Sequence, residues 1–230
     1  MAQKNFIVNL FNDIAPTYDK LNHILSLNVD KSWRRKAVHR IVSNHPQTVL
    51  DIACGTGDFA IAIAQAGVPT VIGADISEGM LEVGRQKVKA LGLNIELRLD
   101  DSEQLHMDDN SVDAVSVAFG VRNFEHLQKG LNEMHRVIRP GGMVYVLELS
   151  VPSNPLLLAL YKLYFLYVLP FFGGLISGNR GAYKYLPNSV LHFPKPAAFC
   201  AMLQEAGFQQ VEAKSFTLGL CRMFTGVKCQ

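Results

Sequence analysis

The sequence predicts an α/β fold with a doubly wound, mostly parallel sheet and a C-terminal antiparallel hairpin. Two observations predict the parallel part. Short apolar segments alternate with helical segments from residue 48 to residue 149, and glycines directly follow the first apolar segment. A third observation predicts the hairpin, because two strand-like segments flank Leu218-Gly219 near the end of the chain. At 230 residues, the chain is expected to form one domain with additions (1–230).

Residues 1–45 are expected to form an N-terminal helical lid. Apolar residues recur at helical spacing in segments 6–14 and 21–25. Ser32 is suitably placed to cap a third helix, which carries Trp33 on its apolar side.

Residues 46–150 are expected to form the core that binds the cofactor. The expected strands are 48–54, 70–76, 95–100, 112–120 and 143–149, and the expected helices between them are 58–66, 78–90 and 125–138. Strands separated by single helices pair in parallel, and ligands bind to such sheets at the carboxyl ends of the strands. The functional residues are therefore sought where these strands end.

Residues 151–195 interrupt this alternation and are expected to be an insertion on the substrate side of the site. Their apolar stretch, 156–172, contains a lysine and a proline and is shorter than the roughly 20 apolar residues of a membrane-spanning helix. A buried helix and a helix on a membrane surface both remain open. Residues 196–230 are expected to add a helix and the hairpin.

The overall composition excludes several kinds of partner. A net charge of +2 gives no basic stripe of the kind that binds nucleic acid. The histidines are scattered, without the close pairs from which a metal site is usually built, so no metal is expected. The first residues contain no long apolar segment typical of a secretory signal, so a cytoplasmic protein is expected.

The most informative segment is VLDIACGTGDFA, residues 49–60. A strand ends near Asp51, and Gly55-Thr56-Gly57 then turns the chain into a helix. Glycines suit such a turn because a ligand must approach the backbone closely and the backbone requires positive φ. The same letters also fit the dinucleotide pattern G-x-G-x-x-A, so an NAD-linked oxidoreductase is the competing hypothesis.

Carboxylates at three strand ends favour S-adenosylmethionine over a dinucleotide. Asp51 places a negative charge where a cationic amino-acid group can be held, and S-adenosylmethionine carries an ammonium and a sulfonium but no pyrophosphate. Asp75, followed by Ile76, ends the second strand and can accept both ribose hydroxyls, a feature that NAD sites share. Asp101 and Ser102 follow the third strand, where an acceptor and a backbone amide can bind an adenine edge.

These motifs, with RVIRPGGMVYVLEL (136–149), together resemble the motif series of class I (Rossmann-like) methyltransferases. Three further segments narrow the resemblance to the ubiquinone/menaquinone-biosynthesis C-methyltransferases. They are FNDIAPTYDKLNHILSLNVDKSWR (11–34), AFGVRNFEH (118–126) and AYKYLPNSVLHFP (182–194). The resemblance implies C-methylation of a prenylated naphthoquinol, demethylmenaquinol, from S-adenosylmethionine; a ubiquinone-precursor benzoquinol is the alternative acceptor.

Methylation of a ring carbon requires an electron-rich quinol, so the site needs groups that assist loss of a hydroxyl proton. Arg122 and Asn123 follow the fourth strand, and we expect Arg122 to polarise the phenolate while Asn123 and Tyr18 orient the quinol oxygens. In the structural alternative, Arg122 pairs with Glu125 or Glu133, and Tyr18 is a core aromatic. Contact with the inner face of the cytoplasmic membrane, a homodimer and a non-catalytic interaction module also remain open.

Overall fold

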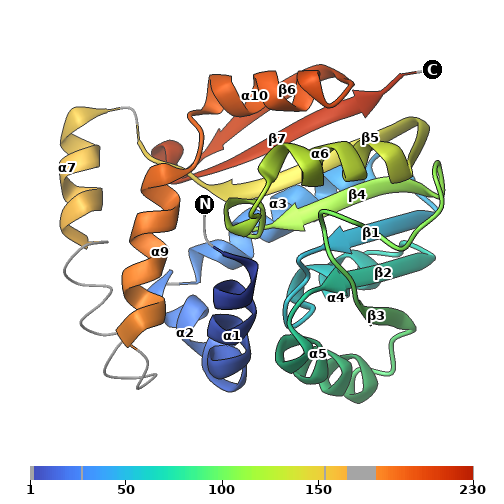
Figure 1. Cartoon of the computed structure of the whole chain (residues 1–230), viewed down its shortest axis with the longest axis horizontal. Helices are drawn as coiled ribbons and strands as arrows, with labels where there is room; N and C mark the ends of the chain where they lie inside the picture. Colours follow the sequence, from blue (N-terminus) through green and yellow to red (C-terminus); the bar gives the residue numbers. More distant parts are fainter. Residues whose placement is uncertain (1–2, 27, 153, 165–179, 230) are drawn as a thin grey trace.

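A computed structural model describes residues 3–26, 28–152, 154–164 and 180–229. Its centre is a seven-stranded sheet in the order β3-β2-β1-β4-β5-β7-β6 (Figure 1). The strands are β1 (Thr48–Ile52), β2 (Thr70–Asp75), β3 (Ile95–Leu99), β4 (Val112–Ala118), β5 (Ile138–Leu149), β6 (Phe208–Phe216) and β7 (Cys221–Lys228). The first five pair in parallel, and β7 is antiparallel to β5 and β6. The predicted sheet and hairpin are both confirmed.

Helices cover both faces of the sheet because successive residues of a strand point to opposite sides. Val49 of β1 packs in one core cluster with α3 (Val29–Val42), α4 (Asp58–Gln65) and α5 (Glu78–Ala90). Leu50 packs in a second cluster with α6 (Leu127–Val137) and α10 (Pro196–Glu205). This arrangement leaves the carboxyl ends of the parallel strands for a ligand.

The remaining helices lie near these strand ends (Figure 1). They are α1 (Lys4–Ile14), α2 (Tyr18–Leu25), α7 (Pro155–Leu163) and α9 (Arg180–His192), with short turns η1 (Ala15–Thr17), η2 (Val121–Asn123) and η4 (Thr217–Gly219). The apolar stretch 156–172 falls partly on α7 and otherwise outside the described residues. Within the described part of the chain, no helix is long and apolar enough to cross a membrane.

Most predicted elements end within two residues of the observed ones, and two predictions about where elements begin are wrong. Ser32 does not cap the third helix, which begins three residues earlier at Val29, after Asn28 in a left-handed conformation (φ 59°). The Pro140-Gly141-Gly142 turn lies inside β5, which begins at Ile138 rather than at residue 143. The register between β4 and β5 shifts there, and Gly141 adopts a φ of 83°.

Candidate active site

The glycine turn after β1 leaves an open space beside the backbone. Gly55 has a φ of 57°, and a Cβ atom added to it meets no atom within 4 Å. Packing within the protein therefore does not require a glycine here, but a ligand that approaches the backbone does. Gly57 has a φ of 79° and precedes the first residue of α4. Both glycines thus have the conformation that the sequence predicts.

Asp51 is a buried carboxylate that lacks a full set of partners. Its Oδ1 accepts a 2.7 Å hydrogen bond from the Ser116 hydroxyl, whereas Oδ2 has no hydrogen-bond partner among the described residues. Burial raises the pKa of Asp51 to about 7, against the opposing effects of the Ser116 bond and of Arg34. A cationic ligand group at Oδ2 satisfies the orphaned oxygen and stabilises the ionised form.

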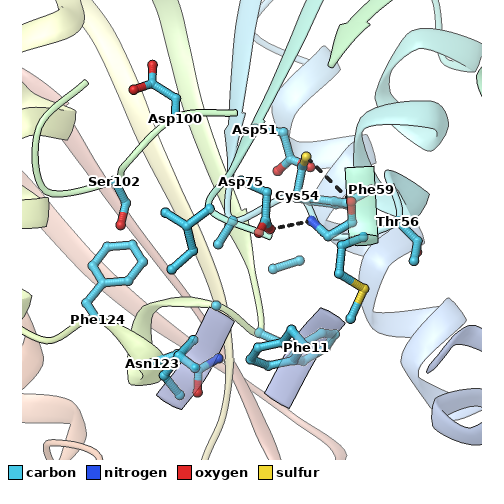
Figure 2. Close-up of a pocket in the computed structure, with 18 of the residues that line it drawn as sticks. Phe11, Asp51, Cys54, Thr56, Phe59, Asp75, Asp100, Ser102, Asn123 and Phe124 are labelled. Atoms are coloured by element: carbon cyan, nitrogen blue, oxygen red, sulfur yellow. Dashed lines mark hydrogen bonds between the residues drawn. The ribbon is translucent and has the colours of Figure 1, made fainter. Parts of the chain in front are cut away.

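Asp75 organises the turn as well as facing the cleft (Figure 2). Its Oδ2 accepts the Gly55 amide at 2.7 Å and its Oδ1 accepts the Ser77 amide at 2.9 Å. Burial raises the pKa of Asp75, although these two bonds oppose the shift. Each oxygen has a second lone pair, so both remain able to accept a ligand hydroxyl.

The third strand adds an acidic residue that is already paired. Asp101 receives a 2.5 Å hydrogen bond from Lys4 Nζ of α1 and a 3.0 Å bond from the Glu103 amide. Burial raises the pKa of Asp101, but the bonds from Lys4 and from the Glu103 amide, together with the charges of Lys4 and Lys129, outweigh burial, so the pKa is lowered. Ile76 and Ser102 line the same cleft.

Residues of α1 and α2 are hydrogen-bonded directly to the strand-end loops. Asp19 accepts from the Thr56 hydroxyl at 2.6 Å and pairs with Lys87 of α5 at 2.7 Å. Asn12 Oδ1 accepts from the Gly79 amide at 2.9 Å. The N-terminal helices therefore close the cleft over the glycine turn.

A second cavity, of about 420 Å³, adjoins this cleft. Its walls come from α2, α3, α7 and α9 and from the turn η4, and they are mainly aromatic and aliphatic: Val29, Trp33, Phe119, Leu149, Pro152, Leu157, Tyr161, Tyr164, Leu186, Leu218 and Leu220. Trp33 Nε1 donates to Thr217 Oγ1 at 2.8 Å, which fixes α3 to η4. Tyr18, Arg34 and Phe119 line both the cleft and the cavity, so the two spaces share a wall.

The expected acceptor residues lie around this shared wall but do not all line one space. Arg122 lines the apolar cavity, Asn123 lines the cleft, and Tyr18 lines both. Asn123 Oδ1 accepts from the Tyr185 hydroxyl at 2.9 Å. Burial raises the pKa of Tyr18, opposed by the charges of Arg122 and Arg34.

The ion pair considered for Arg122 has a different partner. Neither Glu125 nor Glu133 pairs with it; Arg122 Nη1 lies 2.7 Å from Glu148 Oε1, and the two side chains are 6% and 0% exposed. Burial alone lowers the pKa of Arg122, but Glu148 raises it, so the guanidinium stays protonated. Local sequence spacing favoured the wrong glutamates because Glu148 arrives from the neighbouring strand β5.

Several lining residues were not found from the sequence. Lys4, Asp19 and Arg34 reach the cleft from the N-terminal helices, and Phe119 lies between the cleft and the cavity. Their positions depend on how these helices pack, for which single-sequence patterns hold no signal. Phe119 has a φ of 62°, which a sequence does not predict for an aromatic residue.

A model of the ubiE/COQ5 methyltransferase family matches residues 1–228. The chain belongs to this family. It is 44% identical over 225 residues to a demethylmenaquinone methyltransferase of Bacteroides fragilis, covering 96% of this chain and 92% of that one. It is also 44% identical over 226 residues to a ubiquinone/menaquinone biosynthesis C-methyltransferase of Geobacter sulfurreducens, covering 96% and 88%.

Solved structures support the fold of this methyltransferase. An S-adenosylmethionine-dependent methyltransferase from Thermotoga maritima superposes with a TM-score of 0.69 at 18% identity, over 96% of this chain and 99% of that one. The family and the fold together decide against the NAD-linked alternative, and S-adenosylmethionine is the cofactor. The cleft fits it, because Asp51 offers an unpaired buried carboxylate oxygen and Gly55 leaves room at the backbone.

Proposed function

We propose that this methyltransferase converts demethylmenaquinol to menaquinol by methylating a ring carbon of the prenylated naphthoquinol. The observation that carries the proposal is the apolar cavity that shares a wall with the cofactor cleft. Its volume of about 420 Å³ lies within the range of cavities that hold small organic ligands. An aromatic acceptor in the cavity lies next to a methyl donor in the cleft.

Each expected cofactor residue has a role that its position supports. Asp51 holds the ammonium of S-adenosylmethionine, and Asp75 accepts the ribose hydroxyls. Ile76, Asp101 and Ser102 bind the adenine end, and the backbone of Gly55 and Thr56 packs against the amino-acid part. Gly57 does not line the cleft, and its role is to turn the chain into α4. When bound, S-adenosylmethionine supplies a methyl group on a sulfonium.

On the acceptor side, the residues stabilise an ionised quinol. Arg122, kept protonated by Glu148, stabilises the phenolate and so favours loss of the hydroxyl proton. The ionised ring is more electron-rich than the neutral quinol. Tyr18 lies at the shared wall and Asn123 on its cleft side, where both orient the quinol oxygens.

The mouth of the apolar cavity supports a peripheral contact with the inner face of the cytoplasmic membrane. Leu156, Leu163 and Leu218 are 72%, 56% and 74% exposed, and Leu218 lines the cavity itself. Leu156 and Leu163 belong to α7, which also provides Leu157 and Tyr161 to the cavity wall. A prenyl tail that leaves the cavity near α7 and Leu218 can remain in the lipid.

The proposal predicts a preference among acceptors. Reduced demethylmenaquinol, a reduced naphthoquinol without the prenyl tail, and a prenylated ubiquinone-precursor benzoquinol are assayed side by side with labelled S-adenosylmethionine. We expect the highest kcat/KM for demethylmenaquinol, and a higher KM for the tail-less compound because it buries less apolar surface. A higher kcat/KM for the benzoquinol assigns the enzyme to the other acceptor class and refutes the proposal.

A further inference from the structure

The only cation that lines both the cleft and the cavity, among the residues the structure describes, is Arg34 of α3. Arg122 lines the apolar cavity but not the cleft, and Lys4 lines the cleft but not the cavity. Methyl transfer from a donor in the cleft to an acceptor in the cavity must occur at their shared wall. Arg34 therefore borders both spaces at the place where donor and acceptor meet, whereas Arg122 borders the cavity alone.

Arg34 forms ion pairs through Nη1, which lies 3.9 Å from Asp58 Oδ2 and closer to Asp30. Its Nη1 lies 2.5 Å from Asp30 Oδ2, and the two side chains are 13% and 7% exposed. Ser26 donates to the other oxygen of Asp30 at 2.5 Å. The Arg34 Cζ lies 5.2 Å from the centre of the Phe119 ring, so the guanidinium also packs against the shared wall.

This arrangement leaves hydrogen-bonding capacity on the guanidinium. A guanidinium has five N–H donors in a fixed plane. Its Nε is buried and has no hydrogen-bond partner among the described residues. A buried donor of this kind costs free energy unless a ligand acceptor satisfies it.

The chemistry of a quinol supplies such an acceptor. Its two oxygens lie on opposite sides of the ring, and the carbon to be methylated is adjacent to one of them. We propose that Arg34 is a second catalytic residue, which donates to the phenolate oxygen next to the methylated carbon from the shared wall, while Arg122 binds the same oxygen from the cavity side. This inference rests on the proposed acceptor class, and Asp30 acts in it as the positioning residue for Arg34.

The test compares variants of Arg34 that separate the effect of its charge, the effect of its planar guanidinium and the effect on folding. Arg34→Ala removes the group, Arg34→Lys keeps the charge without the planar fork, and the double variant Asp30→Asn/Arg34→Gln leaves no unpaired buried charge. Arg35→Ala is the matched control, since Arg35 is the next arginine of the same helix and is exposed. Turnover with reduced demethylmenaquinol and cofactor affinity are measured for each variant.

We expect Arg34→Ala and the double variant to lower turnover by roughly 10²–10³-fold, as for loss of an oxyanion donor, with partial activity in Arg34→Lys. Turnover is compared at saturating cofactor, because loss of Arg34 removes both its repulsion of a cationic ligand and its stabilisation of ionised Asp51. Arg35→Ala should match the unmodified enzyme. Full turnover in the correctly folded double variant overturns the proposal.

A measurement on bound 1-naphthol tests the role of Arg34 without assuming that demethylmenaquinol is the acceptor. The absorbance of 1-naphthol reports whether its hydroxyl is ionised, and it is recorded in the presence of S-adenosylhomocysteine. The unmodified enzyme should lower the pKa of bound naphthol, and the double variant, which keeps Arg122, should lower it less. Equal ionisation in both proteins, or none in either, refutes the role of Arg34; absence of turnover on demethylmenaquinol with a normal naphthol shift refutes only the acceptor.

Discussion

Replacing Arg122 by alanine is expected to lower turnover by roughly 10²–10³-fold, with little change in cofactor affinity. The proposed interaction strengthens as the phenolate develops, so its loss affects the transition state more than the ground state. The same change also leaves Glu148 as an uncompensated buried charge, which costs about 3–5 kcal/mol of folding free energy. Both effects follow from one ion pair, and they need to be separated.

Glu148→Gln provides the separation. The double variant Arg122→Ala/Glu148→Gln has no unpaired buried charge, so it should recover much of the lost stability but none of the lost turnover. Arg122→Lys should restore activity only in part, because an ammonium keeps the charge but loses the planar fork. Turnover per folded molecule and melting temperature are measured on the same preparation. A double variant with full turnover shows that Arg122 only supports the loop through Glu148.

Gly55→Ala is expected to weaken S-adenosylmethionine binding by roughly 10²-fold, or about 2.7 kcal/mol. The added methyl group enters the space that no protein atom occupies, where the proposed cofactor approaches the backbone. Calorimetry of cofactor binding measures the effect directly.

Gly92→Ala is a closely matched control for this substitution. Gly92 has a φ of 63°, against 57° for Gly55, and a Cβ added there also meets no atom within 4 Å. Both variants therefore carry a similar backbone strain of about 1–3 kcal/mol. Gly92 lies in the exposed turn after α5, so its variant should bind the cofactor normally. Equal affinity in the two variants excludes the proposed approach at Gly55.

The parts of the fold that depend on local chemistry were predictable from the sequence. Helix α5 has the predicted bounds, Glu78–Ala90, because Ser77 caps it through a bond with the Met80 amide. The third helix was placed wrongly because Ser32 resembles a cap, whereas the helix already contains Asp30, which pairs with Arg34 one turn later.

The residues of the candidate site also fall into two groups, those that local sequence predicts and those that depend on tertiary packing. The glycine turn and the aspartates at the strand ends are adjacent in the sequence to the strands that place them, so they were found. The shared wall was not found, because Tyr18 and Arg34 come from the N-terminal helices and Phe119 from the loop after β4. Such a juxtaposition depends on tertiary packing. For the same reason, the sequence did not predict Glu148 as the partner of Arg122.

The central claim is that the enzyme methylates an electron-rich naphthoquinol carbon in the cavity beside the cofactor cleft. The most direct measurement follows labelled methyl groups from S-adenosylmethionine into demethylmenaquinone that is either chemically reduced or kept strictly oxidised. We expect label on the ring carbon of the reduced compound alone, since a quinone ring is too electron-poor to attack the methyl group. Label in the oxidised compound, or on an oxygen of the reduced one, contradicts the account.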